Sequence, residues 1–291
     1  MKRLLIASLL LSLTANAKAV KVDEVLTDAH KYKLEFGLNY SNIQSQSGVF
    51  SVQNIQTSNG DFVTLPIYMG DKKSIEDYVN YSLTLRYGFS KKLELFSSVN
   101  LYYTKTSVSV ANSFRNSSSS GLNSINLGAT YQIKDEDTKP SLLVGFSATA
   151  LEKTKFNDKS YSNSFKTLRV YATSYYTVDP VVFLLNTSCS INFSKKLGDN
   201  RLKGGNIFSI SPQIYFAVNP YTSLNWGVRY THKSKVKLNG KAIENSSSSV
   251  AFLMGASYEL SNSIMLNIDA QYSKTNSNTQ SSISTTISYK F

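Results

Sequence analysis

Strict alternation of apolar and polar residues recurs along nearly the whole chain and constrains its fold more than any other feature. In residues 33–40, Leu34, Phe36, Leu38 and Tyr40 fall on one face of an extended strand, and small or polar residues fall on the other. Successive strand side chains point to opposite faces, so this pattern predicts a β-strand with one apolar face. It returns in residues 79–88, 93–103, 125–132, 142–148, 168–173, 181–193, 208–216, 224–230, 250–258, 264–270 and 283–291.

The beginning of the chain reads as a secretory signal peptide, residues 1–17. Lys2 and Arg3 form a basic start, residues 4–13 are an apolar run, and Ala15-Asn16-Ala17 is a small-x-small cleavage site. The run is too short to span a bilayer, and no later segment approaches the ~20 apolar residues of a transmembrane helix. Export is therefore predicted.

Residues 18–31 follow the signal peptide. They lead into residues 32–291, which hold all of the alternating segments and are interpreted below as a β-barrel. Val22, Val25, Leu26 and Ala29 would share one face of a short helix. The segment is interpreted as a periplasmic lead-in, with a plug of the lumen as the open alternative.

The connections between the predicted strands alternate between short and long. Strands of about 9–12 residues suit a tilted crossing of a bilayer, and short periplasmic turns with long extracellular loops are typical of outer-membrane barrels. We therefore predict an all-β, antiparallel, up-and-down transmembrane barrel of about 12 strands in the outer membrane of a Gram-negative-type envelope. The short connections lie near 89–92, 134–140, 177–180, 219–221 and 261–263, and the long ones cover 41–77, 104–121, 152–164, 194–205, 233–248 and 273–280.

Aromatic residues gather at the predicted strand ends, as the interfacial girdles of a membrane barrel require. A soluble β-sandwich would need neither these girdles nor the export signal. The periplasmic girdle is predicted at Tyr87, Tyr131, Tyr176, Phe216, Tyr258 and Phe291, and the outer girdle at Tyr40, Tyr103, Phe193, Tyr230 and Tyr272.

The long first loop holds two further apolar stretches, residues 49–52 and 62–65, that could pair as a hairpin. Such a hairpin would extend the wall above the membrane, or it would raise the strand count to 14. Twelve strands are favoured, because the charged residues between 71 and 77 suit an exposed loop.

The polar faces of the strands carry eight charged residues. Bare charge within a membrane is costly, so these side chains must face water or one another. Arg86 and Glu94, on adjacent strands, are expected to pair. Both a structural ion-pair ladder and a charge-selective constriction fit the set, which comprises Lys33, Glu35, Arg86, Glu94, Arg169, Arg229, Glu259 and Asp269.

The long loops are basic. Loss of Lys2 and Arg3 with the signal peptide lowers the formal charge from +12 to +10, and the second to sixth long loops account for that excess. In an exported chain this favours lipopolysaccharide phosphates over nucleic acid, and an anion-attracting vestibule is the alternative. The lipopolysaccharide-contact candidates are Lys195, Lys196, Arg201, Lys203, Lys233, Lys235 and Lys237.

The sequence gives little support for a catalytic site or a metal-binding site. His232-Lys233-Ser234 resembles the His-x-Ser pair of the outer-membrane phospholipase, in which His is the base and Ser the nucleophile, but Lys235-Val236 departs from that pattern. The single cysteine, Cys189, excludes an internal disulfide. We therefore expect no enzyme, no cofactor and no metal site.

Three segments resemble a family of outer-membrane transporters named for the meta-cleavage pathway of phenol degradation. Residues 87–95 (YGFSKKLEL) are similar to its strand-turn-strand, residues 121–128 (GLNSINLG) to its Gly-rich start of a middle strand, and residues 141–146 (SLLVGF) to its next strand. Ser124 stands where the family usually has Asp. The resemblance implies a barrel that moves small molecules across the outer membrane.

The chain end carries a further resemblance. Ile283, Ile287, Tyr289 and Phe291 share one face of the last strand. This register resembles the C-terminal signal that the barrel-assembly machinery reads, with Tyr289 and Phe291 as its aromatic residues. We therefore expect a channel for passive passage of a small solute, either anionic or small and hydrophobic. A surface or adhesion barrel without transport, acting through the Ser-rich stretches 117–120 and 246–249, and an outer-membrane phospholipase remain the alternatives.

Overall fold

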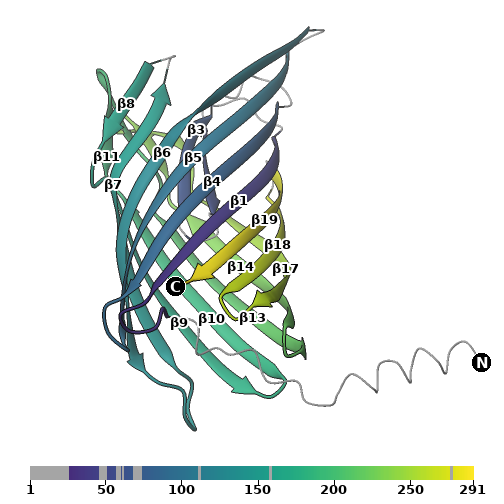
Figure 1. Ribbon diagram of the computed structural model, residues 1–291. Coiled ribbons are helices and arrows are strands. Elements are labelled where there is room, and N and C mark those ends of the chain that lie inside the picture. Colours follow the sequence, from purple (N-terminus) through teal and green to yellow (C-terminus); the bar gives the residue numbers. More distant parts are fainter. Residues whose placement is uncertain are drawn as a thin grey trace, which may run out of the picture.

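The computed structural model describes residues 26–45, 51–56, 60, 62–67, 74–110, 113–156, 159–275 and 278–291. Within these ranges, twelve strands close into an antiparallel barrel (Figure 1). None of the described residues belongs to a helix long and apolar enough to cross a membrane.

The wall of the barrel follows the chain order, as expected of an up-and-down topology. The predicted count of twelve strands is confirmed, and each predicted strand segment falls mainly in one of them. Around the wall they are β1 (Tyr32–Ser45), β4 (Ser74–Gly88), β5 (Leu93–Val110), β6 (Ser113–Lys134), β7 (Leu142–Phe156), β9 (Thr167–Val178), β10 (Val181–Asn192), β13 (Ile207–Asn219), β14 (Thr222–Lys233), β17 (Ser247–Ser261), β18 (Ile264–Lys274) and β19 (Asn278–Lys290).

The first and last strands close the barrel. β1 pairs with β19 from Lys33 opposite Lys290 to Ser45 opposite Asn278. At the end of this seam, Tyr32 and Phe291 exchange two backbone hydrogen bonds of 3.0 Å. Their rings stack at 5.8 Å between centroids. Phe291 therefore completes the seam.

The two faces of the wall differ as the alternation predicts. In β4 the inward residues Ser82 and Thr84 are buried, whereas Leu83 and Leu85 between them are exposed on the outer face. The girdle aromatics that are exposed in the same way are Tyr131, Phe216, Tyr258 and Phe291 at the periplasmic end, and Tyr40, Tyr103, Phe193, Tyr230 and Tyr272 at the outer end.

The wall rises further on the extracellular side than predicted. β5 and β6 remain paired from Leu93 opposite Tyr131 to Val110 opposite Ser113, through much of the expected second long loop. The Ser-rich stretches are likewise strand: residues 117–120 lie in β6 and residues 247–249 in β17. Above the membrane a strand has water on both sides, so no apolar face is needed and no alternation marks it in the sequence.

Shorter strands complete the extracellular side. β8 (Lys159–Asn163) pairs with the end of β7. A separate hairpin joins β2 (Ser51–Gln56) to β3 (Phe62–Ile67). A four-stranded sheet, the extracellular sheet, has the order β11 (Ser194–Leu197), β12 (Asn200–Lys203), β15 (Val236–Leu238) and β16 (Lys241–Glu244).

Candidate functional site: the barrel interior

The barrel encloses a cavity of about 370 Å³. Its lining mixes charged, polar and apolar side chains from most of the wall strands. Among the predicted lumen charges, Arg86, Arg169, Arg229 and Asp269 line this cavity. The cavity is therefore where the sequence-predicted lumen residues meet.

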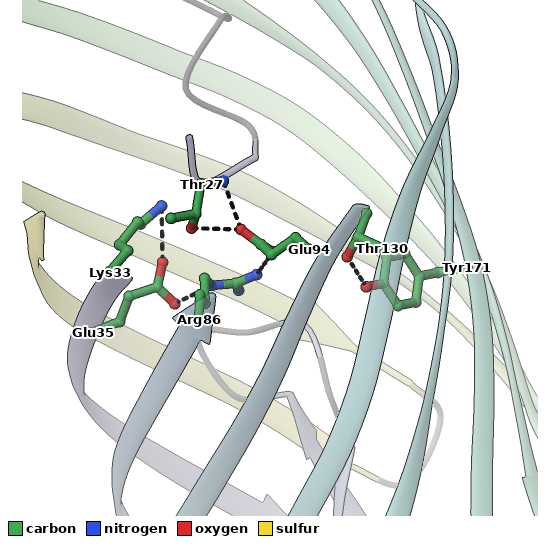
Figure 2. Close-up of polar contacts among 7 residues, drawn as sticks. All are labelled: Thr27, Lys33, Glu35, Arg86, Glu94, Thr130 and Tyr171. Carbon is green, nitrogen blue, oxygen red and sulfur yellow. Dashed lines mark hydrogen bonds and ion pairs between the residues drawn. The ribbon is translucent and has the colours of Figure 1, made fainter. Parts of the chain in front are cut away.

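An ion-pair network around Arg86 joins the cavity lining to the periplasmic ends of the strands, and Figure 2 shows its members converging from β1, β4 and β5. Arg86 Nε donates to Glu35 Oε2 at 2.8 Å, and Arg86 Nη1 donates to Glu94 Oε1 at 2.7 Å. Lys33 Nζ lies 3.1 Å from Glu35 Oε1. The expected Arg86–Glu94 pair is confirmed, and it belongs to a four-member network whose formal charges cancel.

The same network holds the N-terminal segment. The backbone N–H and the hydroxyl of Thr27 both donate to Glu94 Oε2, each at 2.7 Å (Figure 2). Ala29 forms a parallel bridge with Gly88. A Cβ added at Gly88 would lie 2.0 Å from the Asp28 carbonyl oxygen, so this close approach requires glycine.

Leu26, one residue before Thr27, packs against an apolar cluster on the inner wall formed by Leu143, Tyr175 and Val182. Residues 26–29 therefore contact the barrel interior, and residues 18–25 of the proposed lead-in lie outside the described residues. The sequence did not reveal this contact, because Leu143, Val182 and their neighbours fall on the face that alternation assigns to a polar lumen.

The β2–β3 hairpin approaches the cavity from the extracellular side. Figure 1 shows β3 inside the ring of strands, and Gln56 and Gly60 line the cavity. Gln56 Nε2 donates to the Gly60 carbonyl at 3.0 Å. Gly60 has a φ of +76°, and a Cβ there would lie 2.9 Å from the Arg169 guanidinium. The hairpin turn therefore touches the inner wall at Arg169.

Pairing within the first long loop is thus confirmed, but both expected placements of the hairpin are wrong. It neither extends the wall nor adds two wall strands, since β2 and β3 form a sheet of their own. Of the charged residues between 71 and 77 that favoured an exposed loop, residues 71–73 lie outside the described residues. Glu76 and Asp77 lie in wall strand β4, and Glu76 is buried, so for these two the expected exposed loop is wrong.

Two cavity arginines lie over aromatic rings. The Arg169 guanidinium is 4.7 Å from the centroid of the Tyr171 ring, and that of Arg86 is 5.4 Å from the Phe96 ring. The Tyr171 hydroxyl is hydrogen-bonded to Thr130 Oγ1 at 2.7 Å (Figure 2). Such cation–π contacts hold a guanidinium without neutralising it, so each arginine is oriented over the inner wall.

The opposite wall presents a third arginine. Arg229 Nη1 donates to Gln271 Oε1 at 2.6 Å, and Asn225 Nδ2 donates to Asp269 Oδ1 at 3.3 Å. No ion pair within 4 Å joins Arg229 to a described carboxylate. The remaining lumen candidate, Glu259, is half-buried on the inward register of β17, apart from the cavity.

The basic extracellular residues fall into two groups. Lys195 is 3% exposed and forms an ion pair with Glu152, so its assignment to lipopolysaccharide contact is wrong. The Glu152 carboxylate makes this burial possible, because a buried lysine needs a paired negative charge. Lys233 is paired with Glu244 and is mostly covered. Lys196, Arg201, Lys203, Lys235 and Lys237 are exposed.

The predicted His-x-Ser pair is not assembled. His232 Nδ1 is hydrogen-bonded to Ser248 Oγ at 2.9 Å, whereas Ser234 Oγ accepts the Asn206 backbone N–H at 2.8 Å. Across the described part of the chain, no group of three or more His, Cys, Asp or Glu residues could hold a metal ion.

Solved structures share the barrel fold. The outer membrane channel from Pseudomonas putida F1 superposes with a TM-score of 0.64 at 14% identity, covering 94% of this chain and all of that one. The translocator domain of the autotransporter NalP from Neisseria meningitidis gives 0.52 at 10% identity, covering 96% and 91%. No curated protein matches the sequence. Residues 82–291 match the family described as "Putative MetA-pathway of phenol degradation", and the chain belongs to this family of outer-membrane barrels.

Proposed function

We propose that the chain is an outer-membrane channel for the passive passage of a small solute. The observation that carries the proposal is the cavity of about 370 Å³ that the wall strands and the β2–β3 hairpin line. Cavities of this size hold small molecules. Strands from around the barrel line it, so a solute inside would be surrounded by the wall on its way between the two mouths.

The lining favours two kinds of solute. Arg169 and Arg229 favour a small anion, because guanidinium groups bind carboxylates and phosphates through paired donors. Phe96, Tyr171 and Leu253 offer an apolar surface to a small hydrophobic molecule. The similarity to a solved outer membrane channel supports the barrel, and the channel role itself rests on the cavity.

Neither alternative gains an observation in its favour. Residues 117–120 and 247–249 are built into wall strands rather than free loops, which removes the basis of the adhesion hypothesis. A phospholipase needs a base beside its nucleophile, and here His232 and Ser234 have different partners.

Liposome swelling with a panel of sugars, anions and aromatic compounds tests the proposal. Purified protein should accelerate swelling for some of these solutes, and a planar bilayer should show single-channel currents. A variant in which a short turn replaces residues 46–73 serves as the open control. Absence of currents and of swelling in both proteins would rule out a channel.

Export and assembly belong to the same proposal. Residues 1–17 would direct secretion, and the barrel-assembly machinery would read Tyr289 and Phe291. These two rings stack at 5.6 Å, and Tyr289 is exposed on the lipid-facing side of β19. An exposed aromatic pair at the last strand is accessible to an assembly factor before the barrel closes.

A further inference from the structure

The extracellular sheet has one face that the protein covers and one that it leaves to water. Leu197, Leu202 and Val236 on the covered face are almost fully buried and pack with Tyr161 of β8. The sheet lies next in sequence to four wall strands: β11 follows β10, β12 precedes β13, β15 follows β14 and β16 precedes β17. It therefore continues that part of the wall beyond the outer girdle.

The other face gathers four cations, here called the basic face: Lys196, Arg201, Lys203 and Lys237. Lys196 stands directly opposite Arg201, and Lys203 stands directly opposite Lys237. Like charges directly opposite on a sheet destabilise it. Two such pairs in one small sheet indicate that a negatively charged group compensates the repulsion between these cations.

The chain itself does not neutralise these cations. In the part of the chain that the structure describes, no carboxylate forms an ion pair with any of the four. Nearby Lys195 and Lys233, by contrast, are paired with Glu152 and Glu244. The region therefore supplies carboxylates to Lys195 and Lys233 and leaves the basic face unpaired.

The basic face also has a defined shape. Arg201, Lys203 and Lys237 line a hollow of about 560 Å³ together with Asp199 and Asn239. The Arg201 backbone N–H donates to Asn239 Oδ1 at 2.8 Å, and Asn239 Nδ2 donates to Asn200 Oδ1 at 2.8 Å. These bonds join β12 to the β15–β16 turn, so the backbone positions that carry the cations are held relative to one another. Three cations face one carboxylate in the hollow.

We propose that the basic face binds the phosphate groups of lipopolysaccharide around the barrel. Phe193, an exposed girdle aromatic, immediately precedes β11, so the sheet begins at headgroup level. Arginine and lysine at fixed spacing suit phosphate oxygens, which accept several charge-assisted hydrogen bonds at once. The proposed lipopolysaccharide site does not depend on the channel function, so an experiment can reject either proposal without rejecting the other.

Binding of fluorescent bisphosphorylated lipid A to the detergent-solubilised full chain tests the proposal. The double variant R201Q/K203Q should bind at least tenfold more weakly, which corresponds to losing about one charge-assisted hydrogen bond. The matched control K91Q/K139Q removes the same charge from exposed lysines of the periplasmic turns and should bind like the wild type. Heat-modifiable gel mobility verifies that each variant is folded.

Two further probes identify the ligand. Lipid A without phosphates should bind poorly; equal binding of the two lipids would overturn phosphate recognition. Soluble inorganic polyphosphate should compete only at much higher phosphate concentration. If it binds the wild type while bisphosphorylated lipid A does not, lipopolysaccharide is the wrong source. Equal affinity of wild type and R201Q/K203Q for lipid A would place the contact elsewhere.

Discussion

Glu94 collects three donors at one buried carboxylate, which makes it the most consequential single residue of the periplasmic side. In Glu94→Gln the amide keeps only one acceptor oxygen and turns an NH₂ group toward a donor. The N-terminal segment should therefore detach, with a loss of roughly 1–3 kcal/mol in the free energy of unfolding. Single-channel conductance should rise. Asp135→Asn, an exposed acid of the same side, is the control; an unchanged conductance in Glu94→Gln would mean that Thr27 does not restrict passage.

Arg229 should set the charge preference of the cavity. It faces the lumen with Gln271 as its hydrogen-bond partner. Arg229→Gln removes the positive charge while retaining donors, so the permeability ratio of chloride to potassium should fall. Reversal potentials in a salt gradient measure this ratio. Arg201→Gln, in the extracellular sheet, serves as the comparison, and an equal drop in both variants would assign selectivity to the vestibule rather than to the cavity.

At the scale of elements, the β2–β3 hairpin is separable from the wall. Ser45 at the end of β1 is paired with Ser74 at the start of β4, so a short turn can join them in place of residues 46–73. This variant should fold, because both flanking strands keep their register. Liposome swelling should become faster and should admit larger solutes. A rate equal to that of the wild type would show that the hairpin does not obstruct the passage.

The wall strands could be predicted because the membrane imposes a two-sided pattern on them. In β4, exposed Leu83 and Leu85 alternate with buried Ser82 and Thr84, and that contrast is visible in the sequence. The hairpin could be predicted as a pairing but not placed, since its position depends on Arg169, more than a hundred residues away. The Thr27–Glu94 bonds and the burial of Lys195 against Glu152 also depend on partners far apart in the sequence, 67 and 43 residues away, which no local pattern reveals.

For the whole molecule, closure depends on the seam between β1 and β19. Phe291→Ala removes the ring that stacks on Tyr32 and Tyr289 but leaves the backbone bonds to Tyr32 available. Less folded barrel should reach the outer membrane, and Phe291→Tyr should restore it. Quantitative blotting of outer-membrane fractions, with and without heating, measures the folded amount. A wild-type level of folded Phe291→Ala would show that the terminal ring is dispensable.

The pairing of the first and last wall strands also sets an order of events. Tyr32 finds its partner Phe291 only when β19 and Phe291 have been delivered, so the ring cannot close before that strand is exported. Until then β1 and the growing end are both open sheet edges, which readily join other strands. Because contacts of such sequence separation form slowly, the chain must be kept from aggregating throughout its transit. Truncation anywhere in β19 should consequently leave an open sheet that is degraded, rather than a smaller barrel.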